Sequence, residues 1–352
     1  MSYGNRSALA SFALIAVSSV AAGQATPRST ADRPPRKVIV GTSMQAFWVK
    51  YPGLDKRLAE LTGIVDSMAA ASKKQYGRGL DIAVLPETSV TGEASHDIVA
   101  SSVPLEGPLK NAFSKSARDH HCYIVVPTYL LEDKGSKRCS NVAILFGRNG
   151  EVVGIYRKVH LAVAEGSDSM ESGSTPGKQA QVFQCDFGKV GIEICFDMEY
   201  DYGWKELARQ GADLVLWPTQ SPQTSQPAAR AADGHYYVVS STWRNNASIF
   251  EPTGKITAQI REPEHILVRE LDLSYALLPW SSQLKNGAAF KEKFGDKAGY
   301  RYYEDEDLGI FWSNDPHRTV GEMIRSMGMI EANQELERIR KLYRAAGVPE
   351  SN

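Results

Sequence analysis

Short apolar runs that alternate with helical patterns constrain the fold of this chain more than any other feature. Residues 37–41, 80–86 and 212–218 have the length and composition of buried strands, and the last two end at a proline that cannot continue a β-ladder. Residues 54–76 follow the first run and carry apolar side chains at a helical period. Strands that alternate with helices predict a layered α/β fold.

Two hairpin patterns add antiparallel pairing to this fold. Asn149-Gly150 lies between apolar runs at 141–146 and 151–156, and Asn-Gly is a strong short-range signal for a hairpin. Gly188 separates two further runs, 182–187 and 190–195. A purely parallel sheet would not contain such turns, so we expect mixed sheets.

Three apolar runs end in side chains that can carry out chemistry. Glu87 follows Leu85-Pro86, and Lys158 follows the second strand of the Asn-Gly hairpin. Cys195 ends the second strand of the Gly188 hairpin. A free thiol has a pKa of about 8.5 and needs a base or a nearby cation to become a nucleophile. A carboxylate and an ammonium are suitable partners, so the three residues predict an enzyme.

The roles follow from the residue types. Glu87 can remove the thiol proton and return it to a leaving amine, while Lys158 and the backbone N–H of Phe196 can stabilise an oxyanion. His160 stands two residues after Lys158 and offers an alternative base for the thiol. A single cysteine at a strand end is by itself more often an inert core residue, so Cys195 depends on the other two.

The three segments, in this order and at these separations, resemble the nitrilase superfamily of carbon–nitrogen hydrolases. The similarity runs from about residue 38 to 273 and includes the approach to Lys158 and the strand at 211–218. It implies a four-layer α-β-β-α sandwich with mixed sheets over residues 36–278. It also implies that Glu87, Lys158 and Cys195 form the catalytic set, without a cofactor or a metal.

The resemblance implies a second glutamate that holds the lysine, seven or eight residues after it. Glu165 stands seven residues after Lys158 and is our first choice, with Glu171 as the alternative. The segment that follows Glu165 is rich in glycine and serine, so its path is hard to place from the sequence.

The residues around the nucleophile bear on the substrate. Cys195-Phe196-Asp197 is similar to amide-cleaving and carbamoyl-cleaving members, whereas the nitrile-cleaving branch usually has Cys-Trp-Glu. Glu193 and Asp197 flank the thiol at two residues. We expect them either to support the thiol from behind or to face the substrate. Arg244 is a candidate contact for a substrate carboxylate.

We therefore expect hydrolysis of a small linear amide or N-carbamoyl compound through a cysteine thioester. Nitrile hydrolysis and acyl transfer by the same site are alternatives, and a catalytically silent exported binding protein is a third. The 40 Lys and Arg nearly balance 41 Asp and Glu, and no basic run interleaves with aromatics, so a nucleic-acid partner is not expected. The four cysteines match no zinc spacing and allow at most one disulfide if Cys195 stays reduced.

The two ends of the chain lie outside this catalytic domain. Residues 1–23 have the charged start, short apolar stretch and small-residue cleavage site of a signal peptide, which predicts an exported protein, periplasmic or secreted, without a membrane span after cleavage. Residues 24–35 are expected to be a disordered leader. Residues 279–352 form a C-terminal extension with a long helix over 320–346, an interface or a pocket cover. The resemblance implies a homodimer or a higher homo-oligomer.

Overall fold

The computed structural model describes residues 30–348, apart from residues 93, 96 and 136. The predicted signal peptide and residues 24–29 of the predicted leader lie outside the described residues. No helix in the described part of the chain is long and apolar enough to cross a membrane.

The first of two large sheets has six strands in the order β12-β1-β2-β3-β4-β5. β1, β2 and β3 run parallel, and the remaining neighbours pair antiparallel. β4 and β5 form the predicted Asn-Gly hairpin. The strands are β1 (Lys37–Ser43), β2 (Ile82–Val84), β3 (Tyr123–Asp133), β4 (Arg138–Phe146), β5 (Val152–Arg157) and β12 (Ile266–Asp272).

The second sheet repeats this arrangement in the order β6-β7-β8-β9-β10-β11. Its three inner strands β7, β8 and β9 are parallel, and the other pairs are antiparallel. The two sheets therefore share one pairing pattern, although the sequence shows no internal repeat. The strands are β6 (Val182–Cys185), β7 (Gly188–Ile192), β8 (Leu214–Pro218), β9 (Tyr237–Ser241), β10 (Ala247–Phe250) and β11 (Ile256–Ile260).

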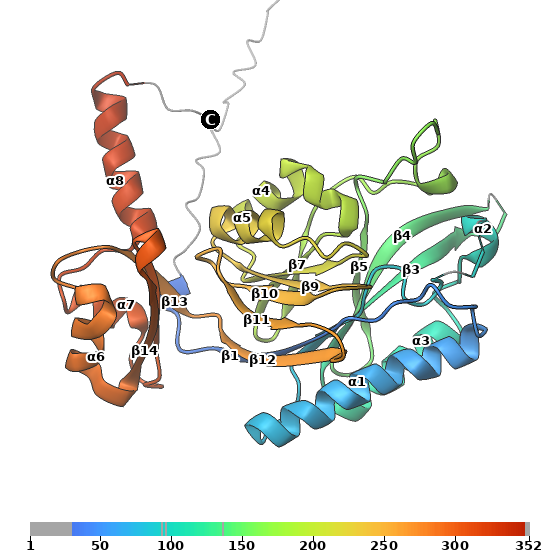
Figure 1. Cartoon of the computed structure of the whole chain (residues 1–352), viewed down its shortest axis with the longest axis horizontal. Coiled ribbons are helices and arrows are strands. Elements are labelled where there is room, and N and C mark those ends of the chain that lie inside the picture. The colour runs from blue at the N-terminus through green and yellow to red at the C-terminus, as the bar shows by residue number, and fades with distance from the viewer. Residues whose placement is uncertain (1–29, 93, 96, 136, 349–352) are drawn as a thin grey trace, which may run out of the picture.

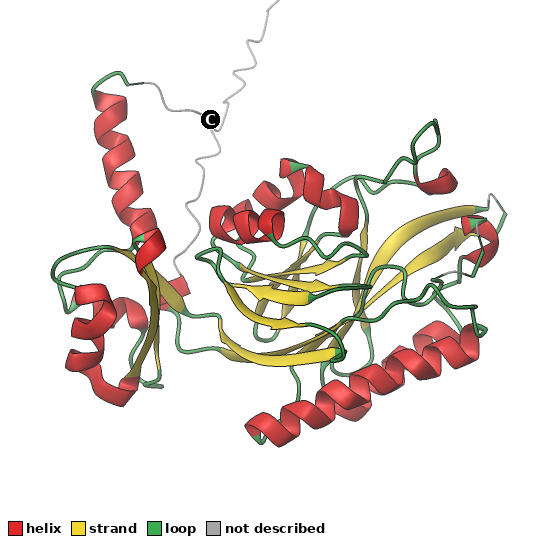
Figure 2. Ribbon diagram, in the orientation of Figure 1, coloured by secondary structure: helices red, strands yellow, loops and turns green. Residues whose placement is uncertain are grey.

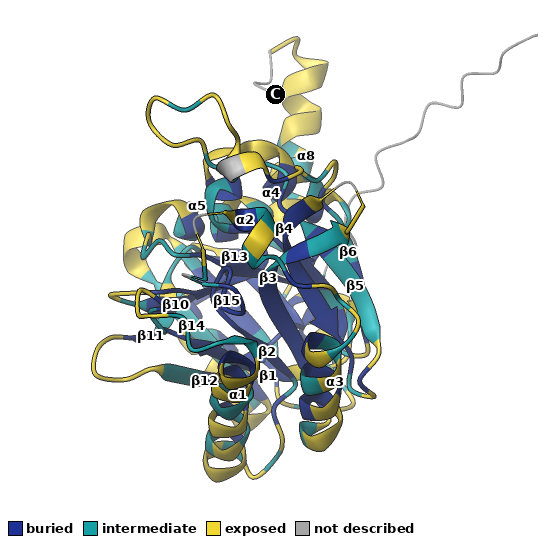
Figure 3. Cartoon of the chain, turned by 90° about the vertical axis from the view of Figure 1, so that its right-hand side faces the viewer, coloured by how far each residue is buried: buried dark blue, intermediate teal, exposed yellow. Residues whose placement is uncertain are grey.

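The sheets pack face to face, and helices cover both outer faces, so the predicted four-layer α-β-β-α sandwich is confirmed (Figure 1). One pair of helices covers the first sheet and another covers the second, while the strands between them are buried (Figure 3). A short helix, α2 (Ile98–Ser101), lies beside β3 and β4. The covering helices are α1 (Leu54–Tyr76) and α3 (Pro108–His120) on the first sheet, and α4 (Asp201–Arg209) and α5 (Ser225–Gly234) on the second.

The C-terminal extension contains a sheet that the sequence did not predict. Strand β13 (Tyr275–Pro279) pairs with β15 (Leu308–Ser313), which also pairs with β14 (Ala298–Tyr303). One face of this sheet joins the core between the two large sheets, and the other packs on α6 (Ala288–Phe294) and α7 (Val320–Arg325) (Figure 2). The predicted domain boundary at 278 therefore falls inside a strand.

Two further expectations about the ends differ from the structure. The long helix predicted over 320–346 is two helices, α7 and α8 (Ala332–Ala345), because the chain turns at Gly328, whose φ is 69°. Residues 30–35 belong to the fold and not to a disordered leader. Ala31 is fully buried against the C-terminal helices, and Arg33 pairs with the buried Asp213.

A partly buried ion pair joins the C-terminal sheet to the catalytic domain. Arg301 of β14 donates two hydrogen bonds, of 2.9 and 2.6 Å, to Glu251 just after β10. The Glu251 side chain is fully buried and also accepts a hydrogen bond from Thr253. Removing one partner of such a pair leaves an uncompensated charge, which destabilises more than loss of an exposed pair.

We predict that Arg301→Met lowers the free energy of unfolding by about 2 kcal/mol, since Arg301 is itself partly exposed. Urea denaturation followed by circular dichroism measures the change. Arg325→Met is the matched control, because its pair with Asp32 is exposed and is worth about 1 kcal/mol or less. Equal effects of the two substitutions would contradict the structural role of the Arg301–Glu251 pair.

Candidate active site

Three strand ends meet at one end of the sandwich and bring the predicted catalytic side chains together. Glu87 lies in the turn after β2, Lys158 directly after β5, and Cys195 at the start of a 3-10 helix after β7. Glu87 and Lys158 are 2% and 1% exposed, and Cys195 is half-buried. The first two come from one sheet and the third from the other, so the site exists only because the sheets face each other.

The ammonium of Lys158 lies between two carboxylates. Its Nζ donates to Oε1 of Glu87 at 2.9 Å and to Oε1 of Glu171 at 3.0 Å. Asn141 bridges the same two oxygens, with Nδ2 3.0 Å from each. The hydroxyl of Tyr129 lies 3.5 Å from Oε1 of Glu171. A buried cation needs such partners, because burial without them is very costly.

The structure places Glu171 at the lysine, where we expected Glu165. The chain leaves the site after Lys158, turns back on itself, and returns through an antiparallel bridge between Val163 and Met170. Glu165 lies in the turn of this excursion with its side chain exposed, and Glu171 follows the returning arm. A fixed spacing from the lysine could not anticipate an excursion of this length.

The backbone is strained at three points beside these side chains. Cys195, Glu171 and Thr88 have φ angles of 43°, 40° and 51°, in the left-handed region that non-glycine residues rarely adopt. Hydrogen bonds hold the turn at Cys195: the indole of Trp217 donates to its carbonyl oxygen at 3.1 Å. Such strain persists only where the surroundings impose it, and it gathers at functional sites.

Burial keeps the resting thiol protonated. It raises the pKa of Cys195 to about 12; the Glu87 carboxylate adds to the increase, whereas Lys158 and a hydrogen bond with Thr219 oppose it. Burial also disfavours the charged form of Lys158, but Glu87, Cys195 and Glu171 outweigh it and hold the lysine pKa well above its ordinary value. The nucleophile is therefore made only when a base takes its proton, while the lysine stays cationic.

Glu87 has an oxygen available for that proton. The two hydrogen bonds that its carboxylate accepts from described residues, from Lys158 and Asn141, both reach Oε1. This arrangement leaves Oε2 to act on the thiol while Oε1 stays fixed. Burial and the nearby Glu87 raise the pKa of Glu171, despite the opposing effect of Lys158.

Glu193 and Asp197 were expected to support the thiol or to face the substrate, and the structure shows both side chains pointing into the protein. The hydroxyl oxygen of Tyr156 lies 3.0 Å from Oε2 of Glu193 and 2.8 Å from Oδ2 of Asp197, within hydrogen-bond distance of each, and both carboxyl groups are about 1% exposed. Asp197 also accepts from the backbone N–H of Ile194 at 3.0 Å, which closes the turn that carries Cys195. Burial, with Asp197 beside it, raises the pKa of Glu193 well above its ordinary value. These carboxyl groups support the nucleophile from behind.

His160 forms its hydrogen bonds in the described structure with Asp197. Its backbone N–H donates to Oδ1 of Asp197 at 2.8 Å, and its Nδ1 lies 3.1 Å from the same oxygen. Its ring stacks on Tyr200 with centroids 3.9 Å apart. The geometry thus favours Glu87 over His160 as the base for Cys195.

Phe196 and Arg244 are sequence neighbours of residues in the candidate site. Phe196 is half-buried, and its ring lies edge-on to that of Tyr200, with the ring centroids 5.9 Å apart. Arg244 is exposed and follows Trp243, whose indole nitrogen donates to the backbone oxygen of Glu87 at 2.8 Å. Arg244 is therefore an exposed residue that directly follows a contact of Glu87.

Comparison with known proteins identifies the family of this chain. The family model for carbon-nitrogen hydrolases matches residues 20–277. The chain belongs to this family. Among curated relatives, omega-amidase NIT2 of Danio rerio is 26% identical over 227 residues, which cover 58% of this chain and 80% of the relative.

Two solved structures share the fold of this hydrolase. Saccharomyces cerevisiae Nit3, a member of branch 10 of the nitrilase superfamily, has a TM-score of 0.57 and 22% identity over 67% of this chain and 90% of its own. A variant of the amidase from Nesterenkonia sp. AN1 has a TM-score of 0.55 and 20% identity over 66% and 93%. The predicted nitrilase superfamily membership is confirmed.

Sequence reasoning missed four parts of the hydrolase site. Asn141 and Tyr129 point at the catalytic carboxylates from β4 and β3, while Trp217 and Thr219 contact Cys195 from β8 and the residue after it. Asn141 carried a signal, since an amide inside an otherwise apolar strand must find partners. The two aromatic residues carried none, because such residues are common in any core.

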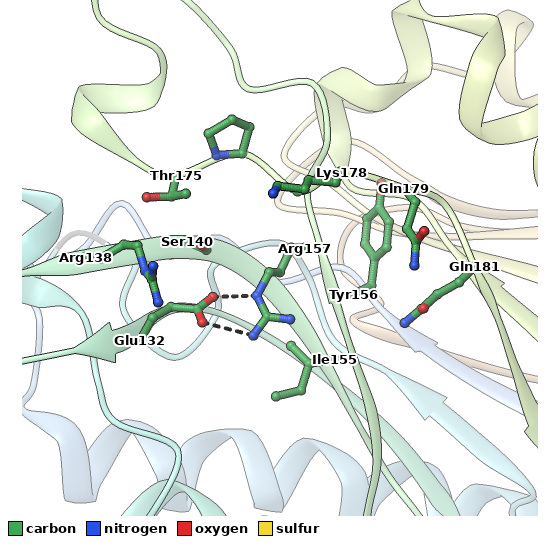
Figure 4. A pocket seen from close by; sticks show the side chains of 12 residues that line it. Glu132, Arg138, Ser140, Ile155, Tyr156, Arg157, Thr175, Lys178, Gln179 and Gln181 are labelled. Atoms are coloured by element: carbon green, nitrogen blue, oxygen red, sulfur yellow. Dashed lines mark hydrogen bonds and ion pairs between the residues drawn. The ribbon is translucent and has the colours of Figure 1, made fainter. Parts of the chain in front are cut away.

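A separate groove of about 440 Å³ lies along β5, where Arg157 forms an ion pair with Glu132 (Figure 4). Neither Glu87 nor Lys158 nor Cys195 lines it, so it is distinct from the catalytic site. No group of His, Cys, Asp and Glu within the described ranges is arranged to hold a metal ion. All four cysteines are free in the structure.

We predict that Glu171→Gln lowers kcat/KM by about 10²-fold or more, because it removes one of two carboxylates that hold the catalytic ammonium. Glu165→Gln, the matched control, should stay within about twofold of the wild type, since its side chain is exposed. Steady-state kinetics of both purified variants tests this. A large loss in the Glu165 variant would refute the assignment of Glu171.

The raised pKa of the Cys195 thiol leads to a second prediction. Because the pKa of Cys195 is raised to about 12, little thiolate is present at neutral pH, and alkylation by iodoacetamide should be slow there. Its rate should climb about tenfold per pH unit from pH 7 to 10 without levelling. The urea-denatured chain should instead level above about pH 9. Mass spectrometry locates the adduct, and a plateau near pH 8 in the native protein would exclude the raised pKa.

Proposed function

We propose that this carbon-nitrogen hydrolase cleaves small linear amides, including N-carbamoyl compounds, through a thioester on Cys195. One observation carries the proposal: two buried acceptor atoms beside the lysine, Oε2 of Glu171 and Oδ1 of Asn141, have no hydrogen-bond partner within the described structure. Buried acceptors without a donor are costly, so a ligand that brings N–H groups is favoured. An amide or carbamoyl nitrogen supplies such donors, and a nitrile does not.

The acylation half follows from the positions of the charges. Glu87 takes the thiol proton as Sγ attacks the carbonyl carbon, and the new oxyanion is stabilised by the Lys158 ammonium and the backbone N–H of Phe196. The C–N bond then breaks, and Glu87 returns its proton to the leaving nitrogen, which departs as ammonia or an amine. The acyl group remains on Cys195 as a thioester.

Deacylation reuses the same groups. Glu87, again ionised, removes a proton from water as the water oxygen attacks the thioester carbon. Lys158 and Phe196 hold the second oxyanion, and the thiolate of Cys195 departs and is protonated by Glu87. The products are a carboxylic or carbamic acid and the resting enzyme.

The relatives give independent support for the proposal that the enzyme cleaves the C–N bond of amides. A curated relative is named an omega-amidase, and the solved amidase variant shows acrylamide added at its own active site cysteine. The residues after the nucleophile, Phe196 and Asp197, favour the same branch. We further propose that Arg244, exposed beside the site, attracts the carboxylate of an acidic substrate.

The experiment measures acyl-enzyme formation and turnover on matched compounds. The panel pairs a linear dicarboxylic monoamide with its neutral methyl ester, and adds an N-carbamoyl amino acid and an aliphatic nitrile. The amides should acylate Cys195 and turn over, whereas the nitrile should do neither. Cys195→Ala should abolish both signals.

The Arg244→Gln variant tests recognition of the substrate carboxylate separately from amide hydrolysis itself. We expect it to raise KM about tenfold for the carboxylate-bearing amide and to leave the neutral ester within about twofold, because only the charged compound loses an ion pair. Equal KM values in both proteins would exclude Arg244 as the carboxylate contact. Absence of any acyl adduct in the wild type would exclude the hydrolytic mechanism.

A further inference from the structure

Two carboxyl groups and one phenol hydroxyl form a buried polar cluster behind the nucleophile. Glu193 directly follows β7, Asp197 lies in the 3-10 helix that begins at Cys195, and Tyr156 belongs to β5. Each of the three side chains is about 1% exposed. The Tyr156 oxygen lies 3.0 Å from Oε2 of Glu193 and 2.8 Å from Oδ2 of Asp197. None of the three takes part in the acylation or deacylation steps proposed above.

The two contacts of the Tyr156 hydroxyl need two protons. A hydroxyl carries one proton, so it donates to only one of the two carboxyl groups. If Glu193 and Asp197 were both ionised, the second contact would be between two oxygens with no proton between them. Two carboxylates that share a buried site also resist ionising together. One of these carboxyl groups therefore carries the proton that the second contact needs.

The other contacts of Asp197 place the negative charge on that residue. Its Oδ2 also accepts a hydrogen bond from the backbone N–H of Ile194 at 3.0 Å, and its Oδ1 accepts one from the backbone N–H of His160 at 2.8 Å. The ring Nδ1 of His160 lies 3.1 Å from the same Oδ1. A carboxylate that accepts several N–H groups is stabilised in its charged form. A proton on either oxygen of Asp197 would displace one of these donors.

Glu193 lacks comparable support for a negative charge. Its Oε1 is buried and has no hydrogen-bond partner in the described structure. Gly203 of α4 packs against this oxygen, because a Cβ at position 203 would lie 2.2 Å from it. A carboxylate oxygen left in this position would carry uncompensated charge, whereas the carbonyl oxygen of a neutral acid costs less to bury.

The charged and titratable groups around Glu193 lead to the same assignment. Burial and Asp197 raise the pKa of Glu193 well above its ordinary value, and the opposing effect of Arg230 on α5 is smaller. Arg230 itself forms an ion pair with Asp201. The hydroxyl of Tyr236, which directly precedes β9, donates to a backbone oxygen of α4 at 3.2 Å.

We propose that Glu193 is a neutral carboxylic acid that donates to the hydroxyl of Tyr156, which in turn donates to the carboxylate of Asp197. The chain ends at the turn of the nucleophile, because Asp197 holds the N–H of Ile194 and Cys195 follows with its φ of 43°. Glu193 is thus a positioning residue that acts through Tyr156 and Asp197. Its effect on catalysis rests on the proposed hydrolysis, whereas its protonation does not.

The pH dependence of stability tests the protonation. An unfolded glutamate has a pKa of about 4.3, so from about pH 5 to 7 the wild type takes up a proton at Glu193 on folding and loses stability as the pH rises. Glu193→Gln lacks this uptake, and its amide N–H can donate to Tyr156. The unfolding equilibrium constant of the wild type, divided by that of the variant, should rise about tenfold per pH unit. Urea denaturation measures both constants, and a ratio that stays level over this range would overturn the proposal.

Infrared difference spectroscopy at pH 7 detects the neutral acid directly. The spectrum of the wild type minus that of Glu193→Gln should contain the C=O stretch of a protonated carboxyl group, and this band should shift in D₂O. Glu335→Gln is the control, because Glu335 on α8 pairs with Arg338 at 2.6 Å and its replacement should remove carboxylate bands only. Carboxylate bands alone in the Glu193 difference spectrum would refute the neutral acid.

Kinetics on the amides of the panel test the positioning role. Tyr156→Phe and Glu193→Leu each break the chain and should lower kcat at least tenfold, with KM within about twofold because the substrate contacts stay in place. Glu193→Gln should restore most of the loss seen with leucine, since an amide N–H replaces the carboxylic O–H. Circular dichroism checks that each variant is folded.

Two kinetic outcomes would contradict the positioning role: a full kcat in Tyr156→Phe, or a Glu193→Gln variant as impaired as Glu193→Leu. A wild type that cleaves no amide would instead refute the proposed function. The stability and infrared measurements would still decide the protonation of Glu193 in that case, so the two failures are distinguishable.

Discussion

The buried ammonium of Lys158 is the interaction on which the rest of the site depends. A cation with 1% of its side chain exposed can persist only with ionic partners, and Glu87 and Glu171 supply them from different segments. Their carboxylates are in turn fixed by Asn141. The positive charge thus holds two carboxylates in place, and it opposes the increase in the pKa of the Cys195 thiol.

The duplicated pairing pattern of the two sheets explains where this cluster forms. Each sheet has three parallel strands at its centre, so each places several strand ends at the same edge. When the sheets pack face to face, those edges come together, and β2 and β7 present Glu87 and Cys195 to each other. The antiparallel outer strands then bring Lys158 and Asn141 into the same space.

Much of the catalytic domain could be predicted from the sequence. The period of residues 54–76 predicted α1, and the Asn149-Gly150 turn predicted the pairing of β4 with β5. The three reactive side chains were found because each follows an apolar run. Loop paths and side-chain direction were not predictable: Glu165 lies in a turn that leads away from the lysine, and Asp197 turns inward because Tyr156 offers a buried hydroxyl. The C-terminal sheet was missed because its aromatic and charged strands lack regular alternation.

Strand β13 has a consequence for how the chain can be divided. Tyr275 and Leu277 point into the core between the large sheets, and Ala276 and Leu278 point into the core of the C-terminal helices. One strand therefore serves two cores, and family similarity ends inside it, at residue 277. A fragment cut at that limit would lose β15 as a partner and expose one end of the sandwich. The C-terminal segment is for this reason part of the same folding unit as the hydrolase domain, and the two should unfold together.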